Sequence, residues 1–567
     1  MSHTKEHSAV TGATAPANAE SQAAWAPLAA WVGLGSLLLV NLPAFLSMGL
    51  DSDVSMYDLL ARRVVLGDVH YRDLLETNFP GIVWLHVVIR SIVGWRSEAL
   101  RAADFIFVAL SAGLLASWVP RPAQSWRRVA VAGGLLAFYL STSEWAHCQR
   151  DMWMLLPALS ALRLRASQAE RLAKQHVSSW ALAGWALGEG MIWASACWIK
   201  PFVAVPAAVC WLVSARHAWK TLGPKRRLLV DLVALAAGGL IVGGVGVGWL
   251  VWSGAWPAFV EVMFVWNREY FSFNVLGDQP WVARTGFVVR LFPWVLVHLA
   301  AVPLAIVALW RPAHLGLSPL SAAFYLAWLS QAVLLQHLFD YVHVPPILLG
   351  MAVVAASGYS CKPVPTNPVL PRSQIPRLAA TFMVVCLSWS YPGLLVQRAA
   401  AWMQCVTEGS TAAVRDRVSL LRRLDWTNLE LVEQFLRNRG VRDGEVTSVT
   451  LSTVALYREL AVAPSTRYVL LQDHLDIFAK RRSVILTALA ASRQKYLVCD
   501  LSRYNMQRVR ALADGVSRQE VLPVSPEPTT DRADGRLAFR AGNYVVFRVS
   551  GAEMPGWLTE HVPRLAE

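Results

Sequence analysis

Charged residues are scarce in this sequence, and its cysteines follow no metal-binding pattern. Only 16% of the 567 residues are Asp, Glu, Lys or Arg, whereas 55% are hydrophobic and the mean hydropathy is +0.39. Soluble domains carry about 25% charged residues, so an ordinary soluble protein is excluded. The seven scattered cysteines lack any C-x-x-C spacing, so no zinc site or disulfide framework is expected.

Nucleotide-binding motifs are also absent, since the chain has neither a P-loop nor a G-x-G-x-x-G turn in its more polar C-terminal part. The net charge of +14 could suit nucleic acid. However, the basic residues of the first 398 positions crowd into short connections between hydrophobic runs, which is typical of a membrane protein. We therefore expect no nucleic-acid partner.

Long hydrophobic runs are abundant. The runs that begin near Trp25, Leu228 and Phe287 each exceed the roughly 20 apolar residues that cross a bilayer. Only helices or closed barrels satisfy backbone groups in lipid, so several such runs predict a polytopic α-helical membrane protein. Eleven spans are expected, at about 25–48, 98–119, 128–142, 151–164, 179–198, 201–215, 228–252, 285–309, 318–336, 341–358 and 377–396.

The basic connections predict the sidedness. They lie at 121–128, 163–176, 216–227, 311 and 362–372, and the positive-inside rule places all of them in the cytoplasm. This scheme holds only if 80–94, which is short and contains His86 and Arg90, is a juxtamembrane helix instead of a span. Residues 1–24 are then a polar cytoplasmic segment, and residues 25–398 are the membrane module. A first external loop covers about 50–97.

The share of charged residues doubles after residue 398, which predicts a separate extracytoplasmic domain at 399–567. Its patterns indicate a small α/β domain that docks or orients an acceptor. We expect helices at 411–424, 427–439, 474–491 and 503–514, and strands at 446–451, 467–472, 495–501 and 544–549.

Polar residues collect at the predicted external ends of the spans. The first loop alone contains Asp51, Asp53, Asp58, Asp68, Asp73 and Glu76. Ionisable groups at membrane depth usually line a cavity or pair with one another. Carboxylates can act as a general base or hold a metal, and cations can hold a phosphate. The pattern favours one external cavity for an anionic lipid whose headgroup reacts, although snorkelling or ion pairing would explain any single residue.

The first loop resembles a known family. Asp53-(x3)-Tyr57, Gly67, Tyr71-Arg72-Asp73 and Pro80-Gly81 are similar to the first-loop signature of bacterial membrane glycosyltransferases of the GT-C class, the relatives of dolichyl-phosphate-mannose-protein mannosyltransferases and aminoarabinose transferases. The segment LYRELAVAPSTRYVL is similar to the tail of many members. The resemblance implies juxtamembrane helices in the first loop and a soluble external tail.

The resemblance also implies site residues and a reaction. Asp53 would be the catalytic base, with Asp151 in QRDMWMLLP as the second acid, and transfer from a polyprenyl-phosphate sugar would invert the anomeric centre. The acceptor would be a lipid, glycan or protein in the bacterial cell envelope, and the enzyme would sit in the inner membrane. Residues that would contact substrate are Tyr57, Tyr71, Asp73, Arg150, Lys200 and His343.

Two departures from the family pattern leave alternatives open. Asn78-Phe79-Pro80 stands where members commonly have Lys-Pro-Pro, so Lys200 or Arg150 would have to contact the phosphate. Asp51-Ser-Asp53 replaces the usual Asp-Glu, so Asp51 is a second candidate base. A divalent metal (Mg²⁺ or Mn²⁺) bridging Asp53 and Asp151 is as consistent with the residues as a metal-free site.

Purely structural roles compete with some of these assignments. Tyr71-Arg72-Asp73 can be a turn that anchors the loop, and His343 can cap a span. Asp58 and Arg62 have the i, i+4 spacing of a surface pair. The glycines at 243, 244, 246 and 248 are spaced for helix packing. At the level of function, the alternatives are a transporter or flippase of lipid-linked saccharides and a non-catalytic assembly or sensor protein.

Overall fold

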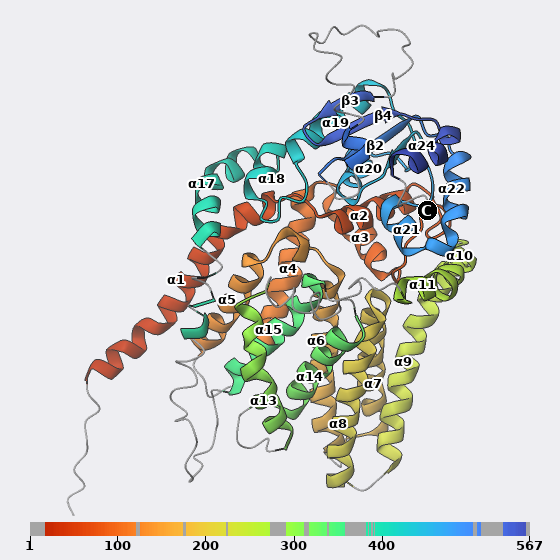
Figure 1. Cartoon of the computed structure of the whole chain (residues 1–567). Helices are drawn as coiled ribbons and strands as arrows, with labels where there is room; N and C mark the ends of the chain where they lie inside the picture. The colour runs from red at the N-terminus through yellow and green to blue at the C-terminus, as the bar shows by residue number, and fades with distance from the viewer. Residues whose placement is uncertain are drawn as a thin grey trace, which may run out of the picture.

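A helical bundle carries a smaller α/β domain at one end (Figure 1). This architecture comes from a computed structural model. It describes residues 17–120, 125–173, 177–222, 225–272, 291–310, 317–336, 339–357, 381–383, 385–386, 389, 392–502, 507–511 and 537–562.

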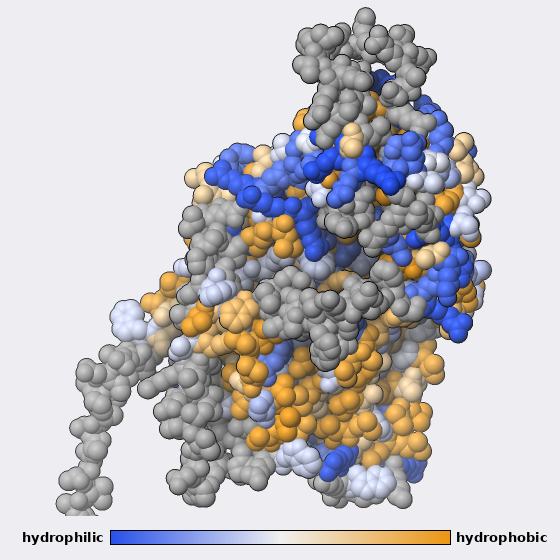
Figure 2. Space-filling model, viewed as in Figure 1, coloured by the Kyte–Doolittle hydropathy of each residue, from blue (hydrophilic) through white to orange (hydrophobic). Residues whose placement is uncertain are grey.

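The bundle is made of long apolar helices. Within the part of the chain that the structure describes, five helical segments are long and apolar enough to cross a membrane, among them Trp25–Ser47 and Arg226–Trp252. Hydrophobic side chains gather over the bundle and hydrophilic ones over the C-terminal domain (Figure 2). The predicted polytopic membrane protein with a small α/β domain is thus confirmed. The bundle helices are α1 (Ala17–Ser47), α4 (Ser97–Ala116), α5 (Ser125–Ser141), α6 (Arg150–Ala173), α7 (Ser179–Ile199), α8 (Ala204–Leu222), α9 (Lys225–Trp252), α13 (Val297–Trp310), α14 (Pro319–Leu334) and α15 (Asp340–Ser357).

Every expected span from 25–48 to 341–358 overlaps one of these helices. Of the last expected span, 377–396, the structure describes 381–383, 385–386, 389 and 392–396, all as helix, and α17 (Pro392–Glu408) begins near its end. The number of crossings and the side on which each loop lies stay predictions.

Two glycines allow the close crossing of α7 and α9. A Cβ at Gly190 would lie 2.0 Å from the carbonyl oxygen of Leu235, and one at Gly238 would lie 2.1 Å from that of Leu187. Of the glycines predicted to serve packing, only Gly246 has a neighbour, the indole of Trp198; the positions at 243, 244 and 248 are open, so for them the prediction was wrong. Glycine spacing alone does not say which face of a helix meets a partner.

Short helices lie between the bundle and the C-terminal domain (Figure 1). Residues 80–94 form one of them, α3, as predicted, and it is two-sided because Ile92 is exposed while His86 and Arg90 are buried. A helix with one exposed apolar face suits a membrane interface. These elements are α2 (Ser52–Val65), α3 (Gly81–Val93), α10 (Trp256–Glu261), the π-helical turn η3 (Val262–Trp266) and α11 (Asn267–Ser272).

The C-terminal domain is built on a four-stranded mixed sheet with the order β1-β2-β4-β3. Strand β1 (Val446–Ser448) runs parallel to β2 (Tyr496–Asp500), and β4 (Tyr544–Arg548) is antiparallel to both β2 and β3 (Leu537–Ala541). The helices around it are α18 (Ala412–Val418), α19 (Trp426–Asn438), α20 (Ala455–Leu460), α21 (Leu471–Ile477), α22 (Arg482–Ala490) and α24 (Met554–His561).

Two expectations for this domain were wrong, and both concern segments that touch the membrane module. Residues 467–472 are not a strand: the carbonyl of Arg467 accepts a hydrogen bond from the N–H of Leu75 in the first loop, and α21 starts at Leu471. The helix expected at 411–424 ends at Val418. Strand β3 was not predicted from the sequence.

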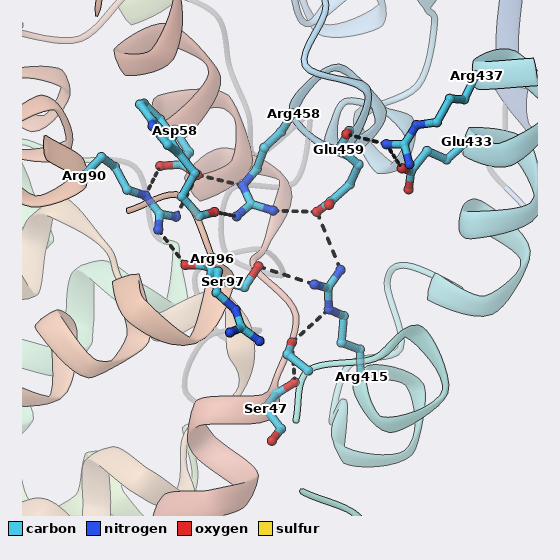
Figure 3. A network of polar contacts seen from close by, with 12 residues as sticks. Ser47, Asp58, Arg90, Arg96, Ser97, Arg415, Glu433, Arg437, Arg458 and Glu459 are labelled. Carbon is cyan, nitrogen blue, oxygen red and sulfur yellow. Dashed lines mark hydrogen bonds and ion pairs between the residues drawn. The ribbon is translucent and has the colours of Figure 1, made fainter. Parts of the chain in front are cut away.

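A buried network of arginines ties this domain to α2 and α3 (Figure 3). Asp58 of α2 is fully buried and accepts from Arg90 of α3 (Nε, 2.6 Å; Nη2, 2.7 Å) and from Arg458 of α20 (Nε, 2.6 Å). The predicted surface pair of Asp58 and Arg62 is therefore wrong, and Arg62 instead lies over the ring of Trp95. The i, i+4 rule failed because α2 is covered on the face that carries Asp58.

Candidate active site

Helix α2 carries the two candidate bases at its N-terminus. Asp51 is the N-cap, and its carboxylate accepts from the backbone N–H of Asp53 at 3.4 Å. Asp53 lies in the first helical turn, and Tyr57 follows one turn later, so their side chains share a face of α2. Asp51 and Tyr57 are buried, whereas Asp53 is half-buried.

The electrostatic setting separates the two acids. Burial and the neighbouring Asp53 carboxylate together raise the pKa of Asp51 to about 7, although Arg423 and the hydrogen bond from the Asp53 N–H act in the opposite direction. Burial also raises the pKa of Asp53, but Arg150, Arg423 and a hydrogen bond from the indole of Trp145 act in the opposite direction. Cations and donors favour a carboxylate in its ionised form. Asp53 therefore has the stronger case as the ionised base, and Asp51 the stronger case as its protonated neighbour.

Arg150, at the start of α6, is the cation that most of the site shares. It is buried and acts electrostatically on Asp53, Tyr57 and Glu76, and it is in turn influenced by Tyr341. Its Nε has no hydrogen-bond partner among the described residues. A buried guanidinium with an unused donor is suited to hold an anionic group.

Glu76 adds a third carboxylate from the first loop. Its Oε1 accepts from the backbone N–H of Asn78 at 2.8 Å, and Oε2 has no partner in the described part of the chain. Burial raises the pKa of Glu76 to about 7, against the effect of Arg150. The Asn78 side chain also reaches the hydroxyl of Tyr57 at 3.4 Å, which connects this loop to α2.

Asp151 and Lys200 form a buried ion pair beside these groups. The Lys200 ammonium, between α7 and α8, donates to Oδ1 of Asp151 at 2.7 Å, and both side chains are almost fully buried. Oδ2 of Asp151 has no hydrogen-bond partner among the described residues. His343 of α15 is buried within electrostatic range of Lys200.

The hydrogen bonds of Tyr71 and Asp73 stay within the first loop and fit the turn interpretation. Tyr71 has a positive φ of 67°, is buried, and donates its hydroxyl to the carbonyl of Asn78 at 2.7 Å. Asp73 accepts from the N–H of Val69 at 2.8 Å and pairs with the exposed Arg72. These contacts hold the loop that presents Glu76 and Asn78, so direct substrate contact by Tyr71 and Asp73 stays a prediction.

The residues at this site do not make a metal centre as they stand. No group of three or more His, Cys, Asp or Glu side chains able to hold an ion occurs among the residues that the structure describes. One oxygen of Asp151 is already paired with an ammonium, and Asp53 faces guanidinium groups.

An apolar groove of about 680 Å³ runs between α7, α8 and α9 and includes the residue that follows Lys200. Pro201, the next residue along the chain, lines it together with Phe79 of the first loop and Trp198 of α7. Trp211 and Leu232 line the part that lies further into the bundle. A groove of this kind in a membrane helix bundle is suited to a hydrocarbon chain.

Sequence reasoning named Asp53, Tyr57, Arg150, Asp151 and Lys200, and the structure brings these side chains together around Arg150. It missed the roles of several neighbours that approach from distant segments. Trp145 and Arg423 carry no motif; only the position of Trp145 in the short loop SEWAHCQRD could have drawn attention to it. The other neighbours are Glu76, Asn78, Tyr270 and Tyr341.

Comparison with solved structures identifies the fold. The crystal structure of ArnT from Cupriavidus metallidurans bound to undecaprenyl phosphate is similar over 92% of this chain and 98% of that chain, with a TM-score of 0.50 and 14% identity. The same protein in the apo state gives a TM-score of 0.45 and 13% identity over 93% and 98% of the two chains. An Archaeoglobus fulgidus oligosaccharyltransferase tethered with an acceptor peptide gives 0.42 and 11% identity, over 86% and 70%.

No protein-family model and no curated protein matches the sequence. At 14% identity the similarity to ArnT concerns the fold alone. It extends over nearly the whole length of both chains, membrane bundle and C-terminal domain together. The GT-C fold expected from the first-loop residues is thus confirmed.

Proposed function

We propose that this protein is a membrane glycosyltransferase that moves a sugar from a polyprenyl-phosphate donor to an acceptor on the side of the C-terminal domain. The observation that carries the proposal is the juxtaposition of Asp53 with the buried cation Arg150, where Asp53 also accepts a hydrogen bond from the indole of Trp145. A base and an anion-binding group within electrostatic range of each other are what glycosyl transfer from a phosphate requires. The GT-C fold agrees with this reading.

Asp53 acts as the general base in this scheme. Its carboxylate accepts the proton of an acceptor hydroxyl or amine as the acceptor oxygen or nitrogen attacks the anomeric carbon. The bond from that carbon to the phosphate oxygen breaks on the opposite face, so the anomeric configuration inverts. The raised pKa of Asp51 leaves this carboxyl group largely protonated near pH 6, so it adds little negative charge that would repel the anionic donor.

Charge grows on the phosphate as the sugar departs, and Arg150 with Lys200 is placed to balance it. Lys200 stands in for the lysine that the first loop lacks at Asn78, and Asp151 holds its ammonium in position. The groove that Pro201 lines would hold the polyprenyl chain with its phosphate directed toward Lys200. Fixed charges aimed at developing charge are commonly the largest single contribution to catalysis.

A panel of polyprenyl-phosphate sugars tests the proposal. Purified protein in lipid nanodiscs is incubated with each donor and a crude envelope acceptor fraction, and free polyprenyl phosphate is quantified by mass spectrometry. Release with at least one donor is expected. A transporter or flippase would instead move a labelled donor across the membrane of sealed vesicles without releasing its phosphate carrier, and that result would overturn the proposal.

A further inference from the structure

We infer that the C-terminal domain completes the active site, and that Arg423, delivered by residues 419–425, is a positioning residue for the base Asp53. This inference rests on the proposed function. The segment 419–425, here called the strap, is irregular backbone between α18 and α19. Its role differs from the docking or acceptor-orienting function expected for the domain from sequence.

Glu144 fixes the beginning of the strap to the membrane module. This glutamate lies in the loop between α5 and α6, six residues before Arg150, and it is buried. Its carboxylate accepts from the N–H groups of Leu420 (3.0 Å) and Leu421 (3.1 Å) and from the hydroxyl of Ser419. Three donors on one buried carboxylate pull the chain out of the helix that the sequence predicts there.

Trp426 fixes the other end. Its indole packs against Gly49, where a Cβ would lie 2.4 Å from the ring, so only glycine allows this approach. Gly49 stands two residues before Asp51, so Trp426 touches the segment that begins α2. The N–H of Trp426 donates to Asp416 at 2.7 Å, and the N–H of Asp425 donates to the hydroxyl of Tyr544 in β4 at 3.0 Å. The strap is thus tied to both the membrane module and the sheet.

Between these two anchors the backbone turns through Arg422, whose φ is 48°, and presents Arg423 to Trp145. The Arg423 guanidinium carbon lies 3.8 Å from the centroid of the Trp145 ring. Close stacking of a guanidinium on an indole is a favourable cation–π contact. The edge of the same indole also meets Tyr341, with ring centroids 5.6 Å apart at 82°.

Trp145 connects Arg423 to the reacting group. Its indole N–H donates to Asp53, and the positive charge of Arg423 acts on both Asp53 and Asp51 in the direction of ionisation. Arg423 therefore has two effects on the base. It orients the indole that hydrogen-bonds to the carboxylate, and it opposes the rise in pKa that burial causes.

The test is the pH profile of kcat/KM for transfer, measured as polyprenyl phosphate release. An opposite charge near a carboxylate lowers its pKa by about 1–3 units. In Arg423→Gln the acidic limb of the profile should therefore move up by about 1 unit or more. Activity should fall at neutral pH and recover as the pH is raised. Arg423→Lys, which keeps the charge and can still stack, should hold the limb close to the wild-type position.

A control in the same domain uses the same substitution. Arg437→Gln alters an arginine of α19 whose side chain is 61% exposed and whose ion pair with Glu433 lies at the surface, so its profile should match the wild type. An Arg423→Gln protein that folds but shows an unshifted limb, with activity lowered equally at every pH, would overturn the role in positioning. A wild type that is inactive with every donor would instead overturn the proposed function, and this role with it.

Discussion

Replacing Asp58 by Asn removes the carboxylate that joins Arg90 to Arg458 in the arginine network of Figure 3. Asp58 and Arg90 have side chains with 0% exposure, and that of Arg458 has 7%. Breaking a buried ion pair by removing one partner costs about 3–5 kcal/mol, because the remaining charge stays buried without compensation. The loss is large because Arg90 and Arg458 both lose their ion pair with this carboxylate.

The remaining contacts of the two arginines decide where in that range the value falls. Arg90 keeps the carbonyl oxygens of Gly94 (3.0 Å) and Arg96 (2.6 Å). Arg458 keeps the carbonyl of Trp95 at 2.9 Å and its ion pair with the neighbouring glutamate. We therefore expect a loss near the lower end, about 3 kcal/mol.

The assay is thermal unfolding of the purified protein in detergent, together with the rate at which a protease releases the C-terminal domain. The matched control is Asp73→Asn, whose pair with Arg72 is exposed and should contribute about 0–1 kcal/mol. Asp58→Asn should melt well below both the wild type and this control and be cleaved faster. Equal melting of the two variants would refute the reasoning.

The same network has a defined pH dependence. Burial alone would raise the pKa of Asp58, but Arg458, His86 and Arg90 hold this pKa well below its usual range. A carboxyl group with a depressed folded-state pKa contributes stability above the pKa of the unfolded chain, about 4, and loses it as the pH falls further. The difference between wild type and Asp58→Asn should therefore persist from pH 8 to pH 5 and shrink only in stronger acid.

Three further predictions concern other parts of the molecule. Gly238→Ala should reduce the yield of folded protein, because its Cβ would lie 2.1 Å from the carbonyl of Leu187, whereas Gly248→Ala, which meets nothing within 4 Å, should fold normally. Because the pKa of Asp51 is raised to about 7, the folded protein keeps a proton on this carboxyl group that the unfolded chain releases near pH 4. The contribution of Asp51 to stability should therefore fall as the pH rises from about 4 to about 7. Asp51→Asn should flatten the pH dependence of the melting temperature in this range. Treatment with EDTA should leave polyprenyl phosphate release intact, because guanidinium and ammonium groups supply the positive charge at the site; loss of activity that Mg²⁺ or Mn²⁺ restores would contradict this and favour a metal shared with Asp53.

Local patterns predicted much of the fold. Hydrophobic runs placed the bundle helices, and the short segment with His86 and Arg90 was correctly expected to lie outside the bundle as a juxtamembrane helix. Alternating patterns located β2 and β4. These features are set by periodicity within one segment, which is what a single sequence records.

Contacts between distant segments were not predictable in the same way. Asp58 has the spacing of a surface pair, yet it is buried because α20, 400 residues later, covers that face of α2. The strap does not form the predicted helix, because its backbone N–H groups donate to the carboxylate of Glu144, about 275 residues earlier in the chain. Residues such as Arg423 gain their place at the site from tertiary packing, which overrides local propensity.

The central claim is that Asp53 drives transfer of a sugar from a polyprenyl-phosphate carrier, and one measurement tests it most directly. Wild type, Asp53→Asn and Asp51→Asn are compared, at equal amounts of folded protein, for polyprenyl phosphate released from the best donor of the panel. Loss of a general base costs about 10²–10⁴-fold in rate, so Asp53→Asn should lose that much while Asp51→Asn retains most activity at neutral pH. Full activity of a folded Asp53→Asn protein would contradict the account.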